Sequence, residues 1–87
     1  MKDKPAFTRL VLSLAQTGYM QLGIVKDPFS GKRIKSLEAA RETIELLEVL
    51  KQKTKGNLTD EEIKILEEAL YELKTAFITQ KNKDNSL

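Results

Sequence analysis

The chain has 87 residues and a net charge of +2, from 15 Lys and Arg against 13 Asp and Glu, and it contains neither Cys nor His. This length supports one domain with a thin hydrophobic core. Without Cys or His the sequence offers no disulfide, no thiolate metal site and no imidazole to act as a metal ligand or proton shuttle. Three common routes to catalysis are therefore closed.

The charges are distributed unevenly along the chain. Residues 1–35 carry seven Lys or Arg and two Asp, for a charge of +5, whereas residues 36–87 carry eight basic and eleven acidic side chains, for −3. A basic half joined to an acidic half favours contact between the two, either within one chain or between copies.

An apolar helix is predicted over about residues 5–22. Pro5 suits its first turn, and the apolar side chains follow one helical face that is widened by Leu12 and Tyr19 beyond what one neighbouring helix covers. The segment is too short and too polar for a membrane span, which needs about 20 apolar residues. We therefore expect burial on more than one side. Because the N-terminus lacks a signal-peptide pattern, we expect a cytoplasmic protein.

The connection over residues 23–35 is predicted to be a long basic loop. Its segment 27–31, Asp-Pro-Phe-Ser-Gly, is typical of a turn, and its apolar side chains favour packing along the helices. The alternatives for its basic cluster are an acidic protein surface, RNA and an anionic membrane. The candidate anion-binding residues are Lys26, Lys32, Arg33 and Lys35.

Two further helices are predicted over about residues 36–55 and 60–80, joined by a tight junction. Ser36 suits the N-cap of the first, and Gly56 suits the left-handed conformation that ends it. Thr59 and the Glu three residues later have the spacing of a capping box at the start of the second. Short junctions of this kind predict an antiparallel helical hairpin.

The fold class is therefore all-α, with three helices in one domain over residues 1–81 and a frayed tail over 82–87. The helical hairpin packs against the apolar first helix. In the helix over 36–55, Leu46 belongs to the apolar half of the helical wheel, whereas Val49 is the one apolar residue in the charged half. The candidate interface residues are Leu12, Tyr19, Val49, Tyr71 and Ile78, of which Tyr71 and Ile78 have no evident partner within the chain.

Several short patterns together indicate a family. They are L-x-L-x-x-x-x-x-x-Q-L-G over residues 12–23, D-P-F-S-G-K over 27–32, A-R-E-T-I-E-L-L-E-V-L over 40–50, K-T-K-G-N-L-T-D-E-E over 53–62 and L-Y-E-L-K over 70–74. With these patterns the chain resembles the bacterial domain-of-unknown-function family 1844 (DUF1844). The resemblance implies a small, soluble, all-α protein without an assigned activity, so no functional residues carry over.

We expect a non-enzymatic interaction module that self-associates, with a dimer favoured and no cofactor. The alternative is an accessory protein that binds anions or nucleic acid through residues 26–35, and nucleic acid is the less favoured partner because the overall charge is low. Glu38, Glu42 and Glu45 share one helical face, but we expect solvated surface there and no metal site.

Overall fold

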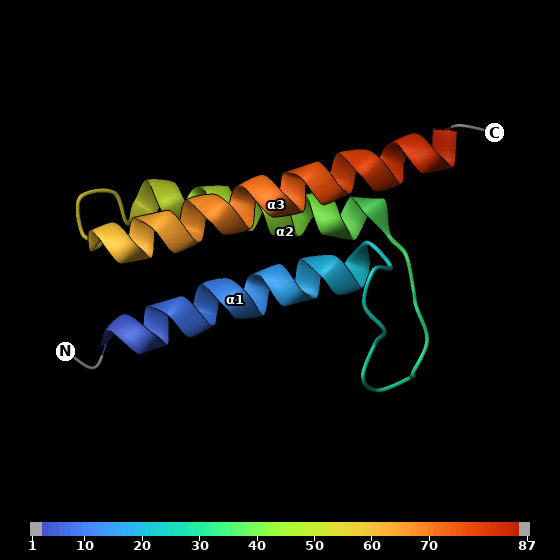
Figure 1. Cartoon of the computed structure of the whole chain (residues 1–87), viewed down its shortest axis with the longest axis horizontal. Coiled ribbons are helices and arrows are strands. Elements are labelled where there is room, and N and C mark those ends of the chain that lie inside the picture. Colours follow the sequence, from blue (N-terminus) through green and yellow to red (C-terminus); the bar gives the residue numbers. More distant parts are fainter. Residues whose placement is uncertain (1–2, 86–87) are drawn as a thin grey trace.

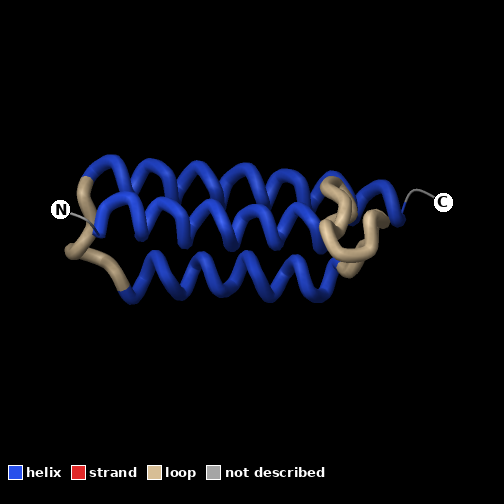
Figure 2. Tube along the Cα trace, turned by 90° about the horizontal axis from the view of Figure 1, so that it is seen from below, coloured by secondary structure: helices blue, strands red, loops and turns tan. Residues whose placement is uncertain are grey.

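The computed structural model describes residues 3–85, and the side chains of residues 6–84. The described chain forms three helices, α1 (Asp3–Gln21), α2 (Leu37–Lys53) and α3 (Asp60–Asn85), and no strand beyond a single isolated bridge. Each helix packs against the other two, and all three run side by side along the long axis of a body that measures 47 × 26 × 16 Å (Figure 1, Figure 2). The predicted all-α fold, with a hairpin and a first helix packed against it, is confirmed.

Local capping chemistry fixes the ends of the hairpin helices. The side chain of Ser36 accepts a hydrogen bond from the amide of Ala39 at 3.2 Å and opens α2. Gly56 has a φ of +86° in the junction after α2, the left-handed region that glycine enters without strain. The capping box at α3 is complete, since Glu62 accepts from the amide of Thr59 at 2.9 Å and donates its own amide to the Thr59 hydroxyl at 3.1 Å.

The third helix is longer than predicted, because it ends at Asn85 rather than near Gln80. A frayed tail over residues 82–87 is therefore wrong for 82–85, while residues 86–87 lie outside the described part of the chain. The Lys35 ammonium donates to the Asp84 carboxylate at 2.6 Å and so ties the last turn of α3 to the loop before α2. This tertiary contact offsets the polar composition of the segment.

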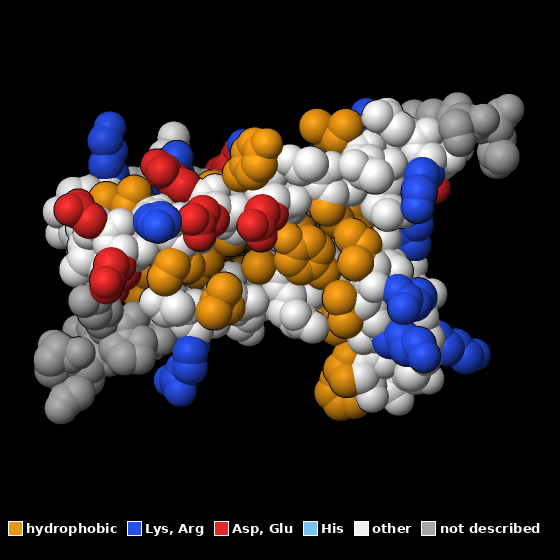
Figure 3. Space-filling view, viewed as in Figure 1, with side chains coloured by type: hydrophobic (Ala, Val, Ile, Leu, Met, Phe, Trp, Pro, Cys, Tyr) orange, Lys and Arg blue, Asp and Glu red, His pale blue; other side chains and the backbone are white. Residues whose placement is uncertain are grey.

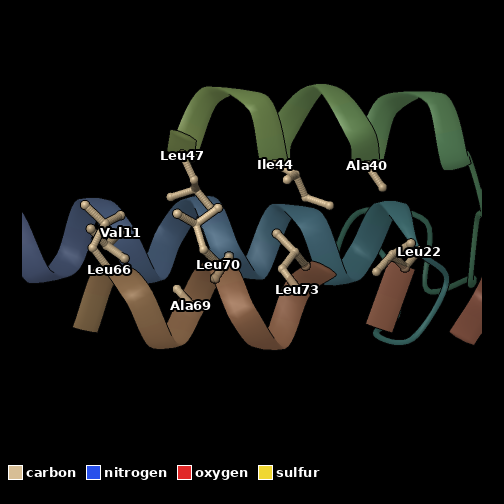
Figure 4. Packing of buried hydrophobic residues seen from close by; sticks show 10 residues of the cluster. Val11, Leu22, Ala40, Ile44, Leu47, Leu66, Ala69, Leu70 and Leu73 are labelled. Atoms are coloured by element: carbon tan, nitrogen blue, oxygen red, sulfur yellow. The ribbon is translucent and has the colours of Figure 1, made fainter. Parts of the chain in front are cut away.

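All three helices contribute to one hydrophobic core, in which apolar residues spaced three or four apart point toward the shared axis (Figure 4). Leu47, Leu66 and Leu73 are at most 1% exposed, and full burial of such a side chain stabilises a fold by about 1.5–3 kcal/mol. The buried apolar residues are Val11, Ala15, Leu22, Ala40, Ile44, Leu47, Leu66, Ala69, Leu70 and Leu73.

The loop between α1 and α2 leaves the bundle instead of packing along it. An antiparallel bridge pairs Leu22 with Lys35, and the Ser36 amide donates to the Gln21 carbonyl at 2.7 Å, so the two ends of the loop lie side by side. The residues between them extend away from the helices (Figure 1), and positions 28–36 are all exposed. The expectation that this loop packs along the helices is wrong, because the bridge closes its base before its apolar side chains can reach the core.

Candidate functional site

Four of the five candidate interface residues have exposed side chains. The exposed fractions are 54% for Leu12, 48% for Val49, 72% for Tyr71 and 57% for Ile78. Tyr71 and Ile78 lie seven residues apart and share the outer face of α3, while Leu12 comes from α1 and Val49 from α2. These are large apolar surfaces in water, and such surfaces are informative when they cluster.

Tyr19 behaves differently from the other four. Its side chain is only partly exposed and packs against the buried core cluster. Burial raises the pKa of its phenol, and the nearby carboxylate of Glu72 on α3 raises that pKa further. The Tyr19 side chain therefore extends from α1 toward α3 and is only partly covered.

A shallow groove runs along α2 and α3 near their junction, and we call it the hairpin groove. Its apolar lining residues are Val49, Leu58, Ile63, Leu66 and Leu70. Of these, Leu66 and Leu70 belong to the core, whereas Val49 and Ile63 are exposed. Buried core residues therefore close the floor of the groove, and Val49 and Ile63 supply its exposed apolar surface.

The rim of the hairpin groove carries charges of both signs in equal number. Its acidic residues are Glu45, Glu48 and Glu67, and its basic residues are Lys51, Lys55 and Lys74. Two ion pairs cross between the helices, one from Lys51 to Glu67 at 3.6 Å and one from Lys74 to Glu48. All four of these side chains are about half exposed, so each pair is a weak link in water.

A second hollow on α3 adjoins the hairpin groove. It shares Ile63 and Glu67 with the groove and is bounded by Tyr71. Val49, Ile63 and Tyr71 therefore follow one continuous face of the hairpin, whereas Leu12 and Tyr19 line neither hollow. The structure thus brings together part of the candidate interface and separates the residues of α1 from it.

Ile63 belongs to the apolar stripe of α3, so its sequence position favours burial, yet its side chain is exposed in the groove. The available signal was its spacing from Leu58 across the start of α3, which is that of a hydrophobic staple. Both residues line the groove beside the capping box. A hydrophobic staple places two apolar side chains at the first turn of a helix. The pattern therefore also predicts apolar surface at the start of α3.

The four candidate anion-binding residues lie in or next to the protruding loop, and all are exposed. Lys35 is already paired with Asp84, and the Arg33 guanidinium donates to the backbone carbonyl of Ile24. Lys26 and Lys32 form no ion pair with any residue that the structure describes. Figure 3 shows Lys and Arg side chains at the loop end of the visible face and acidic side chains along the other end of α3.

The described residues contain no group of three or more Asp or Glu side chains placed to hold a metal ion. The helical face with Glu38, Glu42 and Glu45 is exposed. Over the same described range, none of the three helices is long and apolar enough to cross a bilayer.

The fold and its surfaces define a small three-helix bundle whose features are an apolar groove and a basic loop. The model of the domain-of-unknown-function family DUF1844 matches residues 4–79, which is most of the chain. This protein therefore belongs to the DUF1844 family, as its sequence patterns predict. Comparisons with curated proteins and with solved structures found no match.

Proposed function

We propose that this chain is a non-enzymatic, cytoplasmic interaction module that self-associates as a dimer. The observation that carries the proposal is the hairpin groove, with its apolar lining and its three acidic and three basic rim residues. A two-fold interface uses the same patch on both subunits, so the patch must complement itself. A balanced rim meets this requirement, because a second copy presents both signs of charge in turn.

The composition of the exposed face also supports a second copy as the partner. A standard interface buries about 800 Å² on each partner, with an apolar centre and a polar rim. That area is about one eighth of the 6267 Å² surface of this chain. Val49, Ile63 and Tyr71 supply the apolar centre, and tyrosine is among the residues that contribute most to binding energy when it is buried at an interface.

The absence of catalysis in this proposal rests on composition. The sequence has hydroxyl groups but no imidazole to activate one as a nucleophile, and no thiol.

The exposed side chain of Leu12 on α1 supports a second contact surface. The experiment must therefore separate the two faces.

Sedimentation or light scattering over a range of protein concentrations tests the proposal. We expect the wild-type chain to dimerise and the double variant Val49→Ser, Tyr71→Ser to remain monomeric with its helical content unchanged. Ile34→Ser, which removes a 55% exposed apolar side chain from the loop, is the matched control and should dimerise normally. A strictly monomeric wild type rejects self-association, and loss of the dimer in Leu12→Ser alone moves the interface to α1.

A second candidate function is anion binding by the basic loop. It is supported by the side chains of Lys26 and Lys32, which are exposed and form no ion pair with any described residue. Binding to heparin and RNA at several salt concentrations tests it, since an electrostatic contact weakens as salt rises. Absent or salt-independent binding rejects this candidate.

A further inference from the structure

The loop between α1 and α2 holds the most exposed large apolar side chain of the described chain. Phe29 is 98% exposed at the turn of this loop. Ile24 (37% exposed) lies on the segment that leads into the turn, and Ile34 (55% exposed) lies on the segment that leaves it. The loop lies at one end of the bundle in both views (Figure 1, Figure 2), and Figure 1 shows it extending away from the helices. An approaching flat surface can therefore reach these side chains.

Hydrogen bonds hold this turn in one conformation. The Asp27 carboxylate accepts from the amide of Phe29 at 2.8 Å, and the Asp27 carbonyl accepts from the amide of Gly31 at 2.8 Å. The Asp27 amide in turn donates to the Lys32 carbonyl at 2.8 Å, and Gly31 takes a φ of +71°. The exposure of Phe29 is thus a property of an ordered turn, and little conformational entropy would be lost on binding.

The Arg33 guanidinium donates to the Ile24 carbonyl across the loop. This contact links the two segments of the loop that carry Ile24 and Ile34. The loop is also basic, since residues 23–35 contain four basic side chains and one acid, Asp27. The carboxylate of Asp27 is already engaged within the turn.

We propose that this loop binds the surface of an anionic lipid bilayer, with Phe29 inserted among the lipids and Lys26, Lys32 and Arg33 on the headgroups. The inference rests on the second candidate function and names its anion. Basic residues beside a membrane are attracted to its negative surface, and an apolar Phe ring is favoured at the boundary between headgroups and acyl chains. The bundle then lies on the membrane without crossing it.

The apolar side chains favour a bilayer over RNA as the partner. Single-stranded nucleic acid is bound by aromatic rings on which successive bases stack, and this loop has one aromatic residue, Phe29. Its other exposed apolar residues, Ile24 and Ile34, are aliphatic and offer no stacking face. Aliphatic side chains do gain free energy by leaving water for the acyl boundary of a bilayer.

The chain contains no Trp, so Phe29→Trp places a single fluorescent reporter at the loop apex. We expect its emission to shift to the blue with vesicles of phosphatidylcholine and phosphatidylglycerol, and not with phosphatidylcholine alone. Leu46→Trp, at a 56% exposed position of α2 that lines neither hollow of the hairpin, is the matched control and should show no shift. Co-sedimentation of the wild-type chain with the same vesicles measures affinity.

Loop variants give the expected magnitudes. Lys32→Ser with Arg33→Ser should weaken vesicle binding by about 25-fold at low salt, since each cation near an anionic surface contributes about five-fold. Phe29→Ser should weaken it by at least about ten-fold, and both variants should keep the wild-type helical content and melting temperature. Leu46→Ser, at an exposed position of α2 outside the hairpin groove, should bind vesicles as the wild type does.

Three outcomes would overturn the inference. Binding to heparin or RNA without binding to anionic vesicles would reject the membrane and leave anion binding standing. Binding to neither anionic vesicles nor heparin nor RNA would reject both the membrane proposal and anion binding by the loop. A blue shift of the Phe29→Trp reporter that grows with protein concentration in the absence of lipid would place the loop against a second copy of the chain.

Discussion

A Cβ atom on Gly18 would lie 2.7 Å from Cδ2 and 2.8 Å from Cδ1 of Leu73, so α1 and α3 reach their observed spacing because position 18 has no side chain. Leu73 is fully buried, and its neighbours in the core leave its side chain little room to move. The requirement for glycine at position 18 is therefore steric. Its backbone is helical, and a different residue would otherwise favour the helix by up to about 1 kcal/mol.

Gly18→Val should lower the free energy of unfolding by about 1–3 kcal/mol, which is the usual effect of overpacking a core. Urea denaturation measures it. In a Leu73→Ala background the added side chain fills vacated space, so the same substitution should cost much less. Equal costs in the two backgrounds would show that the contact between these positions does not determine the helix spacing.

Gly56→Val should destabilise the fold by more than about 1 kcal/mol, for a different reason. Apart from Gly56 and its two chain neighbours, no residue has an atom within 4 Å of the site where a Cβ would be. Steric contact with the rest of the fold therefore plays no part, but the φ of +86° is strained for a β-branched residue. Gly56→Asn should cost less, since Asn enters the left-handed region more readily. Thermal unfolding measures both variants, and an unchanged melting temperature for Gly56→Val would contradict the left-handed junction.

The helix boundaries that depend on local chemistry could be predicted from the sequence. Ser36 and Thr59 cap their helices through bonds that span three residues, so no knowledge of the tertiary fold is needed. The end of α3 could not be predicted, because it depends on Asp84 meeting Lys35, 49 positions earlier in the chain. The protrusion of the loop has the same origin, since the bridge between residues 22 and 35 is a tertiary contact.

Side chains at the edges of apolar stripes mark a second limit. Leu12 and Tyr19 lie on the same flank of α1, yet Leu12 is exposed while Tyr19 packs against the core. Leu46 belongs to the apolar half of α2 and is nevertheless 56% exposed, next to a fully buried Leu47. A helical wheel gives the direction in which each side chain points. Whether a side chain at the edge of the apolar stripe is buried depends on where the neighbouring helix lies.

The candidate surfaces could be predicted only in part for the same reason. Val49 and Tyr71 are exposed apolar residues on opposite helices of the hairpin, and their helical positions alone indicate this. Val49 lines the hairpin groove, Tyr71 lines the adjoining hollow, and Ile63 lines both. This arrangement depends on how α2 and α3 cross, which the sequence does not specify. The protrusion of Phe29 depends on where the loop closes.

Tyr19 couples the stability of the fold to alkaline pH. Burial, and secondarily the Glu72 carboxylate, raise the pKa of its phenol in the folded state above the value of about 10 in the unfolded chain. The folded state therefore holds this proton more tightly. Its contribution to stability is fully present below about pH 10 and is lost as the pH rises through the folded-state pKa, because the unfolded state ionises first.

Tyr19→Phe should consequently lose less stability than the wild type between about pH 8 and about pH 11, as measured by urea unfolding at each pH. Glu72→Gln should remove part of the same decline, since the carboxylate is the lesser of the two causes. Tyr71→Phe, on the exposed face of α3, is the matched control and should follow the wild type. Parallel profiles for Tyr19→Phe and the wild type would show that the contact of α1 with α3 at this position does not control the alkaline stability.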